Sequence, residues 1–167
     1  IFPVNGHGLV RTIDEQEAYK TPIYYIFELY RKYMVGNKLN LEIKGGAITL
    51  PVEALAVEGA ISKELNRGDI KLNYIDGTAV MTEEGVIHIV LINRSHDKNQ
   101  KVNIKVPDGY LPVTMWKIEN DDINAANSEN ERENISPQMV NLSRKFLNSA
   151  VTISPCEFIM VRYEKNK

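Results

Sequence analysis

The chain has 167 residues, 43% of them hydrophobic, and its 20 basic and 22 acidic side chains give a formal net charge of −2. This length and apolar fraction fit one globular domain with its own core, or one domain with an appendage. The balanced charge forms no basic stripe, so nucleic-acid binding has no electrostatic support. No apolar run approaches the ~20 residues that span a bilayer, so no membrane partner is expected.

The first residue and the single cysteine bear on the origin of the chain. The sequence begins at Ile1 with neither an initiator Met nor a signal-peptide pattern, so we expect an excised or processed piece of a longer protein. Cys156 is the only cysteine, which excludes an intrachain disulfide and leaves the compartment, cytoplasmic or exported, unassigned. Its apolar, strand-like surroundings predict a buried structural thiol.

A helix is predicted over residues 22–34, after a strand and a loop in residues 1–12. Thr21 is a good N-cap, Pro22 suits the first helical position, and Gly36 is placed to end the helix. The apolar side chains that recur at helical spacing, and that should form the buried face, are Ile23, Ile26, Phe27, Tyr30 and Met34.

After Gly36 the apolar period shortens to every second residue, which is typical of half-buried strands. The alternating runs lie at 39–43, 70–74, 102–106, 113–117, 151–153 and 158–163. The run Val86–Ile92 is almost entirely apolar and predicts a central strand covered on both faces. Turn signals separate the runs. We therefore predict an all-β antiparallel sandwich, of jelly-roll type, with an N-terminal helical segment.

Two segments do not follow this rhythm. Residues 51–69 are ambiguous, because alanines favour a helical turn whereas Val52 and Val57 favour a strand. Residues 119–136 are polar and rich in Asn, Asp and Glu. A loop of this length in a compact domain is usually functional, interface-forming or disordered.

The sequence contains no constellation typical of a catalytic centre. It has no glycine-rich phosphate loop and no clustered metal ligands, so no cofactor or metal is expected. His88 interrupts an apolar strand and predicts a hydrogen-bonded sheet histidine. A glycosidase needs two carboxyl groups at a fixed separation. The acidic candidates share one polar loop and are Asp121, Asp122, Glu129, Glu131 and Glu133. We interpret them as a solvated charge run and assign no residue as catalytic.

Aromatic side chains are the candidates for carbohydrate contact, since a sugar can stack on an exposed ring. Trp116 and Tyr110 are the candidate contacts, and Tyr74 and Tyr163 are further rings. A sandwich core also needs aromatics, and core packing is the favoured interpretation. Three sequons, which would accept glycans only in a secreted eukaryotic protein, begin at Asn93, Asn134 and Asn141.

Three stretches, in this order, resemble the C-terminal third of family 51 α-L-arabinofuranosidases. Val4–Thr12 followed by Lys20–Met34 resembles the last barrel strand, its loop and the last barrel helix of that family. Asp76–Ser95 resembles its paired strands ending in an Asn-Arg-Ser turn. Asp121–Asn130 with Ser136–Val140 resembles its Asn-containing loop and the segment that follows. The likeness covers almost the whole chain and rests on the order and spacing of these stretches.

The resemblance implies a (β/α)8 barrel joined to a C-terminal jelly-roll sandwich. Such enzymes release terminal α-L-arabinofuranosyl groups from arabinan and arabinoxylan with retention. Residues 1–36 would be the end of the barrel and residues 37–167 the sandwich. The two catalytic glutamates of the family would lie upstream of Ile1, so this chain is expected to be a non-catalytic accessory domain. Its partners would be the upstream barrel, polysaccharide through the parent enzyme, and other copies in a homo-oligomer.

Two positions depart from the family pattern. Phe2 stands where members often carry a Gln, three residues before the Asn that matches Asn5, and this counts against a sugar contact there. Asn127-Ser128 stands where the family has an Asn-Thr pair.

Two other functions remain open beside the accessory domain. A carbohydrate-binding sandwich would need an exposed aromatic platform or a cleft on one sheet face. A small stand-alone hydrolase would have to use loop carboxylates such as Asp121 and Glu133.

The helix over 22–34 carries a physical expectation of its own. Leaving one large apolar side chain in water forgoes roughly 1.5–3 kcal/mol. With five such side chains on one face, we expect this helix either to fold onto the sandwich or to be buried in a dimer.

Overall fold

The computed structural model describes residues 8–13, 15, 17–50 and 70–166. In chain order the elements are β1 (Val10–Thr12), β2 (Ala18–Lys20), α1 (Pro22–Tyr33), β3 (Asn37–Leu39), β4 (Ala47–Leu50), β5 (Ile70–Asn73), β6 (Ile75–Met81), β7 (Ile87–Asn93), β8 (Gln100–Val102), β9 (Tyr110–Ile118), β10 (Gln138–Asn141), the 3₁₀ helix η2 (Arg144–Asn148), β11 (Val151–Ile153) and β12 (Phe158–Lys165). The predictions for residues 1–7, including Phe2 and Asn5, and for the ambiguous segment 51–69 lie outside the described residues.

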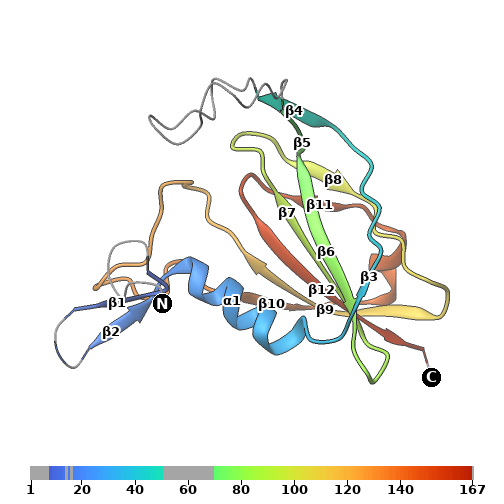
Figure 1. Ribbon diagram of the computed structural model, residues 1–167, viewed down its shortest axis with the longest axis horizontal. Helices are drawn as coiled ribbons and strands as arrows, with labels where there is room; N and C mark the ends of the chain where they lie inside the picture. The colour runs from blue at the N-terminus through green and yellow to red at the C-terminus, as the bar shows by residue number, and fades with distance from the viewer. Residues whose placement is uncertain (1–7, 14, 16, 51–69, 167) are drawn as a thin grey trace, which may run out of the picture.

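The centre of the fold is an antiparallel six-stranded sheet in the order β10-β9-β12-β7-β6-β3 (Figure 1). The β8–β11 pair forms part of a second layer, and its Val102, Val151 and Ile153 share one hydrophobic cluster with the sheet. Strands β4 and β5 pair with each other in a separate ladder. The predicted all-β antiparallel sandwich is confirmed.

Strand β7 divides its side chains between two cores, because successive residues of a strand point to opposite faces. Ile87, Ile89 and Leu91 belong to the cluster between the sheet and the β8–β11 layer. Val90 belongs to a second cluster, on the face that carries α1. All residues of β7 except Ile92 are buried, so the predicted central strand covered on both faces is confirmed.

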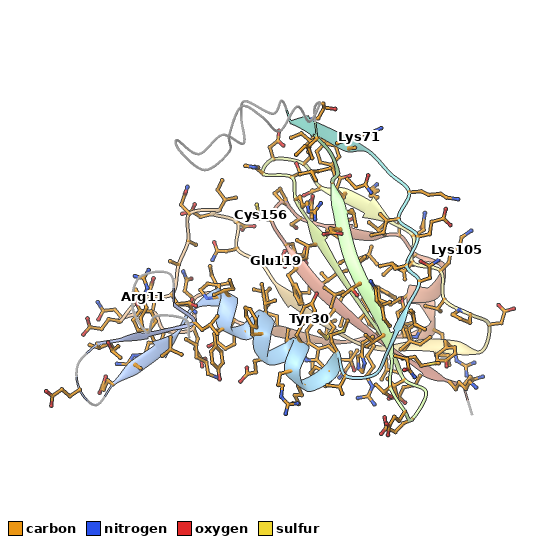
Figure 2. All side chains as sticks on the ribbon, viewed as in Figure 1. Arg11, Tyr30, Lys71, Lys105, Glu119 and Cys156 are labelled. Atoms are coloured by element: carbon orange, nitrogen blue, oxygen red, sulfur yellow. The ribbon has the colours of Figure 1, made fainter. Side chains whose placement is uncertain are left out.

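Helix α1 packs its inner face on the sheet. Tyr25 and Leu29 are each only 6% exposed. The buried side chains of the sheet that share their cluster are Val90, Trp116, Ile118, Phe158 and Met160. Tyr30 also lies on the side of α1 that faces the sheet, with its ring 6.3 Å from that of Phe158 (Figure 2). The helix therefore folds onto the sandwich, as its apolar side chains led us to expect.

The predicted apolar face of α1 is correct only in part. Ile26, Tyr30 and Met34 are half-buried and pack against the cluster on the sheet. Ile23 and Phe27, by contrast, are 47% and 49% exposed. Apolar side chains cover most of the circumference of α1, so the helical period alone could not determine which of them would contact the sheet.

Both ends of α1 lie close to their predicted positions. Thr21 takes the N-cap position with an extended backbone, but its hydroxyl lies 3.2 Å and 2.9 Å from the carbonyl oxygens of Gly8 and Leu9 and makes no cap. Gly36 follows the helix with a φ of +151°. A Cβ at this position would lie 2.3 Å from the carbonyl oxygen of Met81, so only glycine fits.

His88 is buried beneath α1. It is 3% exposed, and its ring centroid lies 5.5 Å from that of Tyr33. Neither ring nitrogen has a hydrogen-bond partner among the described residues, so the predicted hydrogen-bonded histidine is wrong. Burial lowers the pKa of His88 to about 4, and the guanidinium of Arg162 on the adjacent strand acts in the same direction, against the opposing carboxylate of Glu164.

Asn93, at the end of β7, connects three parts of the chain. Its side chain is fully buried, and Nδ2 lies 2.8 Å, 3.0 Å and 2.9 Å from the carbonyl oxygens of Lys98, Ile153 and Ser154. Its Oδ1 accepts the backbone N–H of Ser95 at 2.9 Å. One amide therefore joins the turn after β7 to the end of β11.

Cys156 is exposed, so the predicted buried thiol is wrong. It lies in the turn between β11 and β12 with a φ of +57°, a left-handed conformation uncommon outside glycine. The sequence marks this turn with Ser154 and Pro155, but the apolar strands on both sides led to the wrong interpretation of Cys156.

We expect Asn93→Ala to lower the free energy of unfolding by about 3 kcal/mol, because it leaves buried carbonyl groups without their donor. Asn103→Ala is the matched control, since Asn103 is exposed and should change stability by about 0.5 kcal/mol or less. Chemical denaturation of both variants measures the difference. Equal stabilities would contradict the structural role of the Asn93 amide.

Stability should also depend on pH through His88. The unfolded chain takes up a proton near the ordinary pKa of 6.5, whereas the folded chain does so only near 4, so stability is lost as the pH falls between these values. The full loss is about 3 kcal/mol. His88→Leu should flatten this part of the pH profile relative to the wild type, and His96→Leu, at an exposed position, should leave it unchanged. Parallel profiles for wild type and His88→Leu would refute the assignment.

Candidate functional site

The outer face of α1 exposes apolar surface on the side away from the sheet. Ile23 and Phe27 stand one turn apart and are each about half exposed. A groove of about 460 Å³ runs beside them, lined by Leu9, Tyr24, Phe27, Glu28, Arg31 and Lys32. Apolar side chains bordered by charged ones are typical of a surface that contacts another protein surface.

The β1–β2 hairpin and the start of α1 are joined by Lys20. Its Nζ lies 3.1 Å from Glu28 Oε1 and 4.6 Å from the ring centroid of Tyr24. The hydrogen bond to Glu28 raises the pKa of Lys20, although partial burial opposes the rise. These contacts hold the hairpin against the first turns of the helix.

The long polar loop over 119–136 is attached to the same region. Asn127 is 5% exposed, and its Nδ2 lies 2.9 Å from the carbonyl oxygen of Lys20 and 3.0 Å from that of Ile135. Its Oδ1 accepts the backbone N–H of Ile135 at 2.7 Å. An ion pair between Arg132 and Glu17 makes a second link to the hairpin. The Asn127 hydrogen bond and the Arg132 ion pair therefore hold the loop beside the start of α1 (Figure 1).

The acidic side chains proposed for this loop all lie on the surface. The five exposed carboxylates are Asp121, Asp122, Glu129, Glu131 and Glu133. This exposure agrees with their interpretation as a solvated charge run. Of the three sequon asparagines, Asn93 is buried with its amide engaged, whereas Asn134 and Asn141 are exposed.

The two candidate sugar contacts lie inside the protein. Trp116 is 7% exposed and its ring centroid is 4.4 Å from that of Tyr33. Tyr110 is also 7% exposed, and its hydroxyl donates to the carbonyl oxygen of Gly85 at 3.0 Å. Stacking of a sugar on either ring would require neighbouring chain to move. Tyr163 is buried as well.

A cleft of about 600 Å³ lies at the other end of the sandwich. Its walls are the chain segments 40–46 and 100–105, and Ile75, Ile89 and Leu91 of the sheet line it. Tyr74, the fourth candidate ring, also lines this cleft and is half-buried. The alternating runs at 39–43 and 102–106 predicted strands over their whole length, but β3 ends at Leu39 and β8 ends at Val102. The predicted strands are therefore wrong beyond these residues, and nothing in the sequence indicated the cleft.

Sequence reasoning also missed the buried carboxylate of Glu157. This residue is fully buried, its Oε2 accepts the backbone N–H of Ser154 at 2.6 Å, and Lys117 Nζ lies 3.1 Å from Oε1. Burial raises the pKa of Glu157, while the contacts with Ser154 and Lys117 oppose the rise. The carboxylate closes the turn before β12, and so it holds structure in the same region as Asn93.

The described residues show neither a metal-ion centre nor a membrane-spanning helix. They contain no group of three or more His, Cys, Asp or Glu side chains that could hold a metal ion. No helix among them is long and apolar enough to cross a membrane.

Comparison with solved structures shows a shared fold. The chain is similar to the GH51 arabinofuranosidase of Xanthomonas axonopodis pv. citri (16% identity, TM-score 0.65, covering 93% of this chain and 28% of that one). It is similar to the arabinose complex of the Thermotoga maritima α-L-arabinofuranosidase (18% identity, TM-score 0.68, covering 93% of this chain and 31% of that one). It is also similar to a family 51 α-L-arabinofuranosidase of Bifidobacterium longum (14% identity, TM-score 0.72, covering 94% of this chain and 28% of that one). The chain thus spans less than a third of the length of these structures.

The sequence comparison establishes the family. No curated protein matches the chain. The family model described as the α-L-arabinofuranosidase C-terminal domain matches residues 4–155, which is most of the chain. The resemblance noted in the sequence is confirmed, and the chain belongs to the family of α-L-arabinofuranosidase C-terminal domains.

Proposed function

We propose that this chain is a non-catalytic accessory domain of a retaining α-L-arabinofuranosidase, and that it braces the catalytic barrel through the outer face of α1. The observation that carries the proposal is the exposure of Ile23 and Phe27 on a helix whose other face packs on the sheet. Each side chain forgoes about 1 kcal/mol while it is half exposed. A barrel surface placed over them would recover that free energy.

The proposed division of the chain rests on the family resemblance, in which α1 is the last barrel helix and its outer face would meet the rest of the barrel. Residues 1–36 would form the end of the (β/α)8 barrel, and residues 37–167 the sandwich. The catalytic groups of such barrels lie on the loops that follow the strands. The β1–β2 hairpin directly precedes α1, and the loop over 119–136 is attached to it through Asn127 and Arg132. In the whole enzyme this loop would therefore stand near the catalytic end of the barrel.

The chemistry would then reside in two glutamates upstream of Ile1, acting on terminal α-L-arabinofuranosyl groups of arabinan and arabinoxylan. Retaining hydrolysis needs a general acid that is kept protonated by its surroundings, opposite an ionised nucleophile. The loop carboxylates Asp121 and Glu133, proposed for a stand-alone hydrolase, are both exposed. This exposure supports the accessory function over the hydrolase.

Carbohydrate binding is the second candidate function, and the cleft at segments 40–46 and 100–105 favours it. Tyr74 offers a ring there, and Asn40, Asn73 and Gln100 offer amide groups. A few polar groups around an apolar pocket are the usual composition of a small-ligand site.

The chain alone is expected to release no product from an aryl α-L-arabinofuranoside, whereas the longer gene product that contains it should do so. The chain is also run in native gels that contain arabinan or xylan. Retarded migration without turnover would favour the carbohydrate-binding function. Turnover by the chain alone would exclude the accessory function and point back to the loop carboxylates.

Phe27→Asp should distinguish a bracing face from ordinary surface. In the isolated chain we expect a loss of stability of about 1 kcal/mol or less, because Phe27 is half exposed. In the longer protein we expect a loss of about 2–4 kcal/mol, because the barrel surface would remove the new carboxylate from water. Ile48→Asp, on β4 at a position 38% exposed, is the matched control and should cost the same in both. Equal losses for Phe27→Asp in the two proteins would contradict the proposal.

A further inference from the structure

The six-stranded sheet has two outer strands, and they differ in chemistry. At one edge β3 carries Lys38, and a charged side chain on an edge strand discourages pairing with another chain. At the other edge all four residues of β10 are exposed and uncharged, and its sequence is Gln-Met-Val-Asn. Met139 is 64% exposed and Val140 is 40% exposed. The β10 edge therefore lacks the charge that protects the opposite edge.

The ladder with β9 determines which backbone groups of β10 point outward. The N–H of Leu142 donates to the carbonyl oxygen of Val113 at 2.8 Å, so this residue turns its backbone groups toward β9. In an antiparallel strand, successive residues direct their backbone N–H and C=O groups to opposite sides of the strand. Gln138 and Val140 therefore also face β9, and Met139 and Asn141 direct their N–H and C=O groups away from the sheet. No backbone partner for these outward groups occurs in the described part of the chain.

The side chains of β10 continue the two faces of the sheet. Met139 pairs in register with Trp116, which lies in the cluster beneath α1. Val140 pairs with Met115, which lies in the cluster between the two layers. Each core thus ends in an exposed apolar side chain at this edge.

We propose that β10 pairs antiparallel with β10 of a second copy of this chain, about a two-fold axis at Val140. In this register Met139 lies opposite the partner's Asn141, and the reciprocal pair is formed by symmetry. The outward N–H and C=O groups of Met139 and Asn141 in both strands then form hydrogen bonds with one another. The partner's Val140 meets Val140 on the inner face of the joined sheet.

The register follows from the residues at the ends of the strand. A two-fold axis at Met139 would place Pro137 opposite the partner's Asn141, and proline has no N–H to donate. The axis at Val140 leaves no charge facing another charge, since residues 138–143 contain none. A second copy is therefore the occupant that matches this strand in both hydrogen bonding and charge.

The pairing should be weak and should depend on concentration, because β10 has only four residues. Sedimentation of the wild-type chain at rising concentration should show a monomer–dimer equilibrium. Met139→Pro should abolish the dimer, since it removes an outward N–H without touching the ladder to β9, and edge strands tolerate proline in that orientation. Met139→Lys should also abolish it, whereas Asn37→Lys, the matched change on β3, should leave the dimer intact.

A cross-link tests the register without relying on stability. In a Cys156→Ser background, Val140→Cys should form an intermolecular disulfide, because directly opposed residues of this kind have Cα atoms about 4.5 Å apart, within disulfide range. Met139→Cys should not, since the two copies of residue 139 lie out of register with each other.

Three results would overturn the proposal. The first is a wild-type chain that stays monomeric at all concentrations. The second is a dimer that survives both Met139 variants. The third is a dimer that is lost in Phe27→Asp and kept in Met139→Pro, which would assign the contact to the outer face of α1.

Discussion

The fold depends on covering both faces of one six-stranded sheet with apolar side chains. The central strands β7, β12 and β9 pair with neighbours on each side, so their backbone groups are bonded within the sheet. The stability of these strands then depends on the segments that pack on the two faces of the sheet. The β8–β11 layer covers one face and α1 covers the other. Loss of the β8–β11 layer would expose Ile159 and Val161 to water, and loss of α1 would expose Met160.

Helix α1 covers the sheet largely with aromatic side chains, and among the described residues this packing includes few hydrogen bonds. Tyr33 lies over both Trp116 and His88, and the imidazole nitrogens of His88 find no partner in the described residues. Burial disfavours the charged imidazole in this contact, and the neighbouring guanidinium of Arg162 acts in the same direction. The same packing that holds α1 on the sheet turns its remaining apolar side chains, Ile23 and Phe27, outward. The position of the candidate bracing face is thus a consequence of how the inner face packs.

Two buried amides give the loops defined positions around this core. Asn93 joins the turn after β7 to the end of β11, and Asn127 joins the loop over 119–136 to the hairpin before α1. A neutral amide suits both places, since it offers donors to several carbonyl groups and an acceptor to one N–H without burying a charge. Because Asn127 and Arg132 hold the loop beside α1, the loop and the helix can meet another domain together.

The sequence by itself determined the antiparallel sandwich, several of its strands, the approximate helix and the family. Period-two alternation identified β5, β9, β11 and β12, the apolar run Val86–Ile92 identified β7, and Gly36 marked the end of the helix, because these signals are local. Only the tertiary structure decided which part of α1 is buried, that Trp116 and Tyr110 lie in the interior, and that Cys156 is exposed in a turn. The reason is physical. Periodicity shows that a side chain is apolar, but whether it meets the sheet, another ring or water depends on segments distant in the chain.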